Sequence, residues 1–535
     1  MNQTQTAPTE SARTASHFSA RGVPSSSLKW LMVTALLAAC LGPTFISYKP
    51  IKLSWDDADY LVRAVAVSRA SWSGDVHGLG AAMVSVHTPI MTFLGFPWGP
   101  LTSWSSVGNC FFTLAAAITS LAAVCLYMLL RIGVKPFYLV VASLCVGVSL
   151  GPYPSGVHAD TIDAHSIATG FYADNLLAWL ALAAVLLIPF EARTPSPSIR
   201  SAVLRGILCA PIFSLGALTK VSFFYFIVLI IPVLLFMRYH SSGIRSMLAW
   251  LIALVCGSAP TAIFFLRYGR TPLANAKAAS FGGLAGFYHV PQWQFLAGMV
   301  QDSPGLAISF VLLAAASVYL LVKKRPGLFD ADLIACLIVV GFVVVVLASP
   351  SKQSRYLFPA IVALPFLMSI LVSSKEESIR PRGAALRVAV VFLVLIGVAL
   401  PTRHRTYRQN LTRAQAVLAE AAQSKAKSIV LATDSPTLNV SLLRLTSEFS
   451  SSGISIGTLA YQAIAGVPIE DDLRTMSGTD VAIFQDPRHT NPKFTNQRVP
   501  QYEAYAQRMG AGPARIGEDI YVYRMRIRED RQNSE

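Results

Sequence analysis

Charge is scarce in this chain. Only 13% of its 535 residues are charged, whereas 53% are hydrophobic, and the mean hydropathy is +0.52. A soluble protein carries roughly a quarter of its residues as charged side chains, so this composition excludes a soluble fold for most of the chain. Apolar runs of roughly 17 to 22 residues recur, and each can cross a hydrocarbon core about 30 Å thick as a helix. The sequence therefore predicts a polytopic α-helical membrane protein.

Cysteine is also rare, and a glycine-rich phosphate loop is missing. All seven cysteines lie in or beside apolar runs, and none lies in the C-terminal region. This distribution argues against a disulfide framework or a cysteine-based metal site. Without a glycine-rich loop, the C-terminal region is not predicted to bind a nucleotide.

The formal net charge of +16 invites a nucleic-acid interpretation, but the distribution of the charge argues against one. Basic residues fall largely in short loops on alternate sides of the apolar runs, which is the positive-inside pattern of membrane proteins. We assign these loops and the N-terminus to the cytoplasm, and we predict no nucleic-acid partner. The basic loops lie near residues 13–29, 131–135, 193–205, 238–245, 323–325 and 375–387.

About eleven transmembrane helices are predicted from the apolar runs. Thr219-Lys220 is the only polar break in the long stretch 203–237, and the basic loops that follow stay on one side only if this break is real. With the N-terminus inside, an odd number of spans places the C-terminal region outside. The predicted spans are residues 30–47, 109–130, 136–151, 172–190, 203–219, 222–237, 247–266, 305–322, 331–349, 357–373 and 386–401.

Three regions follow from this division. Residues 1–28 are polar and predict a disordered cytoplasmic tail, residues 29–402 form the transmembrane module, and residues 403–535 form a small α/β domain on the outer side. Strand-like and helix-like segments alternate in the last region, which predicts a mostly parallel sheet. The expected strands are 428–433, 454–460, 480–485 and 519–526, and the expected helices are 403–427, 437–449, 468–477 and 500–509.

An acidic cluster follows the first predicted span, in the segment Ser54-Trp55-Asp56-Asp57-Ala58-Asp59-Tyr60. Asp56 and Asp57 could serve only to stabilise the positive end of a helix that Ser54 caps. One of the two carboxylates could instead act as a general base that takes a proton from an acceptor hydroxyl. The two roles are compatible, because a helix N-terminus would orient the side chain.

The second predicted outer loop contains another group of candidate residues. Its pattern His-x-Asp-x-x-Asp-x-His offers ligands that could hold a divalent metal, and such residues also serve simply to keep a loop solvated. No other cofactor is predicted. The four candidate metal ligands are His158, Asp160, Asp163 and His165.

Basic residues are sparse on the predicted outer side. Lys220 lies at a tight turn between two spans, and Lys352 and Arg355 flank another short turn. Each could snorkel to the interface or neutralise a lipid-linked phosphate. His87 could contact a phosphate or a sugar, and Tyr60 could stack on a substrate, although such residues also gather at interfaces. Asp174, just inside the fourth span, is expected to face the protein interior or a cavity.

With these residues in view, the chain resembles the GT-C glycosyltransferases, in particular the branch of protein O-mannosyltransferases and lipid A aminoarabinose transferases. The acidic cluster matches an Asp-Glu/Asp-Ala-x-Tyr pattern, and further short motifs follow in order along most of residues 30–400. These motifs are His87-Thr88-Pro89, Gly216-Ala217-Leu218-Thr219-Lys220 and Arg355-Tyr356-Leu357-Phe358-Pro359.

The resemblance implies an inverting transfer of a sugar from a polyprenyl-phosphate donor to an acceptor hydroxyl on a glycan, a lipid or a protein. It implies that Asp56 is the base, with Asp57 in support. It also implies that Asp160 or Asp163 is an acid of the second loop and that Lys220 and Arg355 stabilise the departing phosphate. Together with the residues singled out above, the substrate-binding candidates are Tyr60, His87, Asp160, Asp163, Lys220, Lys352, Arg355 and Tyr356. Two departures stand out, since relatives often carry Lys where Thr88 stands, and the histidine-rich second loop matches no pattern of the family.

Two other functions compete with glycosyl transfer. A transporter or lipid flippase of envelope glycan assembly would place ionisable residues near the bilayer midplane, often in repeated halves, but the spans here are nearly free of charge at their centres. A structural subunit of an envelope complex would not need Asp56. The arginine-containing tail and the lack of eukaryotic retention signals favour a bacterial inner membrane, with the C-terminal domain in the periplasm.

Overall fold

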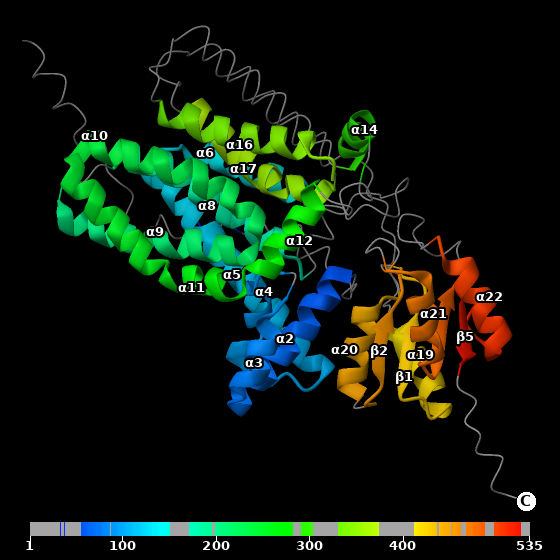
Figure 1. Cartoon of the computed structure of the whole chain (residues 1–535). Helices are drawn as coiled ribbons and strands as arrows, with labels where there is room; N and C mark the ends of the chain where they lie inside the picture. The colour runs from blue at the N-terminus through cyan, green and yellow to red at the C-terminus, as the bar shows by residue number, and fades with distance from the viewer. Residues whose placement is uncertain are drawn as a thin grey trace, which may run out of the picture.

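A helical body and a small α/β domain lie next to each other in the computed structural model (Figure 1). Six helices of the described residues are long and apolar enough to cross a membrane. The structure describes residues 33, 37, 55–85, 87–149, 171–194, 198–281, 289, 291–302, 330–351, 353–373, 411–435, 438–450, 452–460, 462, 467–486 and 497–525.

Helix α8 (Ala173–Arg193) is the centre of the helical body, and nearly all of its side chains are buried. It packs against five other helices, so its apolar surface is covered on every side. These are α5 (Trp104–Arg131), α9 (Ile199–Thr219), α10 (Phe224–Gly257), α16 (Ala331–Ala348) and α17 (Phe358–Ser373). The shorter apolar helix α6 (Pro136–Ser149) packs on α17.

Helix α10 contains a reversal of the chain. Together with the short helix η3 (Val221–Phe223), it forms 37 consecutive residues, which would measure about 55 Å as one straight helix. Gly243 interrupts it with φ 75° and ψ 174°, a backbone conformation outside the helical region. Figure 1 shows the helix turning back at one end of the body. This reversal agrees with the predicted separate spans at 222–237 and 247–266.

The predicted break at Thr219-Lys220 is confirmed. Helix α9 ends at Thr219, and Lys220 is extended, with φ −160° and ψ 138°. The predicted spans at 305–322 and 386–401, and all of 30–47 except two residues, lie outside the described residues. The number of eleven spans therefore stays a prediction.

The segment after the first predicted span forms helices that are not among the six long apolar ones. Exposed aromatic rings gather there, with Trp72 tilted against Phe96 at 5.9 Å between ring centroids. Such rings are typical of membrane–water interfaces. The helices are α2 (Trp55–Ser73), α3 (Val76–Met83), α4 (Ile90–Phe93) and η2 (Phe96–Trp98). Farther along the chain lie α11 (Ala259–Tyr268), α12 (Arg270–Phe281), α14 (Gln292–Asp302) and η4 (Ser354–Leu357).

The C-terminal domain contains a five-stranded sheet in the order β2-β1-β3-β5-β4. The predicted strands and helices are present, but the prediction of a mostly parallel sheet is wrong. β2, β1 and β3 are parallel, whereas β5 and β4 are antiparallel to their neighbours. The strands are β1 (Ser428–Leu431), β2 (Ser455–Thr458), β3 (Val481–Gln485), β4 (Ala511–Ile516) and β5 (Ile520–Arg524), and the helices are α19 (Leu411–Gln423), α20 (Val440–Ser450), α21 (Ile469–Ser477) and α22 (Val499–Met509).

Helix α20 packs on α2 and thereby joins the C-terminal domain to the helical body (Figure 1). Arg69 of α2 pairs with Glu448 of α20 at 2.6 Å, and its Nε donates to the carbonyl oxygen of Leu101 at 3.2 Å. Trp104, the first residue of α5, meets Phe449 edge to face at 5.0 Å between centroids. One small contact region therefore links α2, a long apolar helix and the C-terminal domain.

The ionisable residues of α8 lie at its two ends. Asp174 is in its first turn and Glu191 in its last, which places them about 25 Å apart along the axis. Glu191 accepts hydrogen bonds from Arg205 at 2.9 Å and from Arg238 at 2.8 Å, and both Glu191 and Arg238 are buried. This group holds the last turn of α8, the N-terminal part of α9 and the middle of α10 together.

Removing the carboxylate of Glu191 is expected to destabilise the protein. The change Glu191→Ala leaves the buried guanidinium of Arg238 without its ion-pair partner, which costs about 3–5 kcal/mol. Glu448→Ala breaks an exposed pair worth at most about 1 kcal/mol and is the matched control. Thermal unfolding in detergent measures both variants. Equal melting temperatures would contradict a stabilising role for the Glu191 group.

Candidate active site

Two residues that are 299 positions apart form an ion pair at one end of the helical body. Asp56 lies in the first turn of α2, and Arg355 lies in η4, directly before α17. The guanidinium Nη1 of Arg355 donates to the Asp56 carboxylate. The side chains are 26% and 14% exposed, so the pair is partly buried and remains accessible on the carboxylate side.

A second ion pair lies beside the first. Lys220, in the turn after α9, donates to Asp174 of α8 at 2.5 Å, and the Asp174 side chain is only 4% exposed. The ring of Tyr356 contacts both cations, with Lys220 Nζ at 5.0 Å and Arg355 Cζ at 5.6 Å from its centroid. Cations are attracted to the face of an aromatic ring. The two ion pairs and Tyr356 therefore form one cluster, which we call the paired-charge cluster.

His87 and Tyr60 extend this arrangement on the side of α2. The Tyr60 hydroxyl lies 3.4 Å from His87 Nδ1, and the two ring centroids are 4.8 Å apart. His87 Nε2 lies 3.5 Å from the carboxylate of Asp59, which also accepts a hydrogen bond from Arg63 at 2.9 Å. The imidazole therefore stands between a carboxylate and a phenol.

The surrounding charges set the protonation states of these groups. Burial raises the pKa of Asp56, but Arg355, His87 and Lys220 outweigh it and bring that pKa below its usual value. Burial lowers the pKa of His87, although Asp56 and Asp59 oppose the shift. Burial and the nearby Asp56 raise the pKa of Tyr60 well above its usual value. At neutral pH, Asp56 is thus a carboxylate, His87 a neutral imidazole and Tyr60 a protonated phenol.

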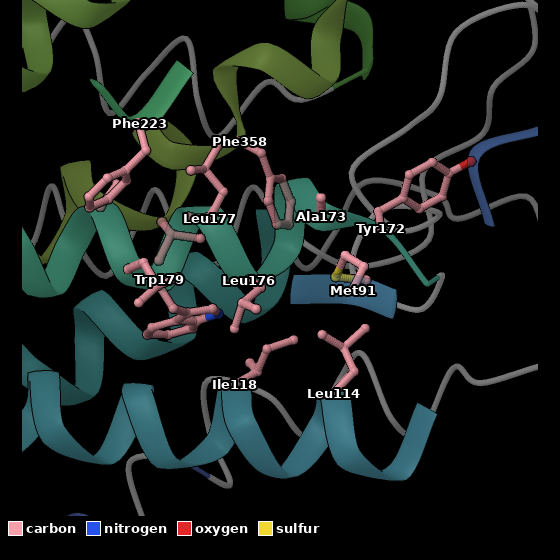
Figure 2. Packing of buried hydrophobic residues seen from close by; sticks show 14 of the residues in the cluster. Met91, Leu114, Ile118, Tyr172, Ala173, Leu176, Leu177, Trp179, Phe223 and Phe358 are labelled. Carbon is pink, nitrogen blue, oxygen red and sulfur yellow. The ribbon is translucent and has the colours of Figure 1, made fainter. Parts of the chain in front are cut away.

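Apolar packing fixes the elements that carry the cluster. Figure 2 shows buried side chains of α4, α5, α8, η3 and α17 that meet in one core. Several are close in sequence to the charged residues, since Phe223 follows Lys220 by three positions and Phe358 follows Arg355 by three. Tyr172 and Ala173 directly precede Asp174. Because these side chains are almost fully buried, the backbone at each charged residue has little freedom to move.

The structure thus brings together six of the residues predicted from sequence: Asp56, Tyr60, His87, Lys220, Arg355 and Tyr356. Asp57 lies beside Asp56 in the chain, but it is only 1% exposed and faces the protein interior. Lys352 lies outside the described residues, as do the candidate metal ligands His158, Asp160, Asp163 and His165. Within the described ranges, no group of three or more His, Cys, Asp or Glu is placed to hold a metal ion.

Asp174 is the member of the cluster that the sequence did not place in the site. The sequence does predict that it faces the interior or a cavity, and the structure agrees, since it is buried at the start of α8. A carboxylate in the first turn of a very apolar helix indicates an ion pair or a polar site, because a charge in that position needs a partner. The identity of that partner, Lys220, depends on how α8 and α9 pack.

The fold is similar to that of known glycosyltransferases. ArnT from Cupriavidus metallidurans in the apo state is 15% identical with a TM-score of 0.53, and the match covers 93% of this chain and 98% of that one. The Archaeoglobus fulgidus oligosaccharyltransferase in the apo form is 11% identical with a TM-score of 0.50, covering 86% of this chain and 70% of that one. Both are members of the GT-C superfamily, so the resemblance to GT-C enzymes is confirmed at the level of the fold. No protein-family model and no curated protein matches the sequence.

Gly216 is required for the turn that carries Lys220. A Cβ atom at this position would lie 2.3–2.4 Å from the ring of Phe223, which is fully buried. We expect Gly216→Ala to cost about 1–3 kcal/mol through overpacking, despite the higher helix propensity of alanine. Gly108→Ala in α5 is the control, because a Cβ atom there has no neighbour within 4 Å among the described residues. Thermal unfolding compares the two variants. A Gly216→Ala protein that melts at the wild-type temperature would refute the requirement for glycine at this position.

Proposed function

We propose that this protein is a membrane glycosyltransferase that moves a sugar from a polyprenyl-phosphate donor to an acceptor hydroxyl with inversion of the anomeric centre. The observation that carries the proposal is the paired-charge cluster, in which Asp56 of α2 pairs with Arg355, Lys220 pairs with Asp174, and the Tyr356 ring contacts both cations. The GT-C fold supports the same function. The acceptor is a glycan, a lipid or a protein.

In this mechanism Asp56 is the general base. Its carboxylate takes the proton of the acceptor hydroxyl while the hydroxyl oxygen forms a bond to the anomeric carbon. The bond from that carbon to the phosphate oxygen breaks in the same displacement, and its electrons leave with the phosphate. A single displacement inverts the anomeric carbon. Asp57, the buried neighbour of Asp56, has a supporting role at the start of α2.

Lys220 and Arg355 stabilise the departing polyprenyl phosphate. Negative charge develops on the phosphate oxygens in the transition state, and fixed cations in a partly buried position are effective there. Tyr356 touches both cations and holds them near each other. His87 and Tyr60, neutral at pH 7, offer hydrogen bonds to sugar hydroxyls. Asp160, Asp163 and Lys352 remain proposed substrate contacts, and a metal at the second loop remains a separate proposal.

The membrane orientation follows from the two ends of α8. We place the end with Glu191, Arg205 and Arg238 in the cytoplasm, because the basic loops of the sequence lie on that side. The paired-charge cluster and the C-terminal domain then lie on the periplasmic side of a bacterial inner membrane. The boundaries 1–28, 29–402 and 403–535 stay our proposed division of the chain.

Replacing the base is the most direct test of the function. Asp56→Asn keeps the size of the side chain but cannot accept the proton, so transfer from a labelled polyprenyl-phosphate sugar in membranes should fall by about 10²-fold or more. Asp75→Asn is the control, because Asp75 caps α3 and asparagine can cap it equally well. Normal transfer by a folded Asp56→Asn protein would remove Asp56 as the base.

Kinetics with the donor substrate test the proposed phosphate-binding role of Lys220 and Arg355. Lys220→Gln and Arg355→Gln each remove a charged hydrogen-bond donor worth about 1.5–3 kcal/mol, so the donor KM should rise about tenfold or more. The acceptor KM should change much less. Arg267→Gln, at an exposed contact with Tyr268, is the control cation. Steady-state kinetics with both substrates varied measure the effect, and an unchanged donor KM would reject the phosphate role.

A further inference from the structure

Every cation described around Asp56 already has a carboxylate partner. Arg355 pairs with Asp56, Lys220 with Asp174 and Arg63 with Asp59. A donor phosphate that binds Arg355 and Lys220 therefore meets cations whose positive charge is already neutralised by protein carboxylates. To make full ion pairs with the cations, the phosphate has to replace at least one carboxylate.

The two carboxylates differ in how easily they can be replaced. Asp174 is 4% exposed and belongs to α8, which five helices surround. Asp56 is 26% exposed and lies at the first turn of α2, which is not among the long apolar helices. A change in one side-chain rotamer is enough to release Asp56, whereas release of Asp174 would leave a charge buried in the core. Asp56 is thus the carboxylate that gives way.

Arg355 also has hydrogen-bonding capacity left over. A guanidinium offers five N–H donors, and Asp56 takes one at Nη1. The Nε atom of Arg355 is buried and has no hydrogen-bond partner among the described residues. Buried donors are normally satisfied, so an unsatisfied one at a candidate site points to a missing acceptor. A phosphate group carries acceptor oxygens that suit the planar fork of arginine.

We propose that the donor phosphate exchanges with Asp56 on Arg355, and that this exchange frees the Asp56 carboxylate to act as the base. The inference rests on the proposed function and adds an order of events to it. While the site is empty, Arg355 holds Asp56 and weakens it as a proton acceptor. Once the phosphate occupies Arg355, the carboxylate is released close to the donor sugar, so the base becomes active only when a donor is present.

Binding of a polyprenyl phosphate without its sugar tests this exchange apart from catalysis. In wild type, the phosphate has to displace Asp56, whereas in Asp56→Asn the Arg355 guanidinium has lost its anionic partner. We expect Asp56→Asn to bind undecaprenyl phosphate in detergent at least tenfold more tightly than wild type. Asp56→Glu keeps the charge and should bind within about threefold of wild type.

Asp59→Asn is the matched control for general electrostatics. It removes one negative charge from the same helix, three positions away, but its carboxylate pairs with Arg63 and not with Arg355. We expect the affinity of Asp59→Asn for undecaprenyl phosphate to differ from wild type by less than about threefold. Equal tightening in Asp56→Asn and Asp59→Asn, or no tightening in Asp56→Asn, would overturn the exchange while leaving the proposed function intact. A wild-type protein that does not bind the lipid phosphate would overturn the donor class and the exchange with it.

Discussion

The exclusion of charge from the hydrocarbon core is the physical constraint on which the rest of this structure depends. Helix α8 shows its effect most clearly, because its long apolar middle carries ionisable residues only in the first and last turns. Each end then needs partners, and these come from neighbouring helices: Lys220 at one end, and Arg205 and Arg238 at the other. One group secures the packing of the helices. The other forms the candidate active site.

The C-terminal domain takes part in this arrangement through α2. Helix α2, with Asp56 in its first turn, is held near its other end by Arg69, which contacts both Glu448 and the backbone before α5. Trp104 and Phe449 add an aromatic contact at the same place. A helix fixed at this point can keep its N-terminus near Arg355 and still allow a single side chain there to change rotamer. The position of Asp56, the proposed base, and the freedom of its side chain to move are therefore compatible.

The sequence predicts the helices and the gathering of Asp56, Lys220 and Arg355 well, and it predicts the individual contacts poorly. Apolar runs and the lone break at Lys220 locate the helix ends, and placing Asp56, Lys220 and Arg355 at one membrane face already indicates that they meet. The pairing of Lys220 with Asp174 could not be predicted, because it depends on the packing of α8 against α9. Strand β4 was missed for a similar reason: its Gly512 and Pro513 break the alternation of apolar residues, and it forms by pairing with β5.

An experimental structure with undecaprenyl phosphate bound is the most direct measurement of the central claim, namely that carboxylates and cations from distant segments form one phosphate-responsive site. We predict that the phosphate oxygens lie within hydrogen-bonding distance of Arg355 and Lys220, that Asp174 keeps its contact with Lys220, and that Asp56 has left the guanidinium. A phosphate bound elsewhere on the protein, with the pair of Asp56 and Arg355 unchanged, would contradict the account.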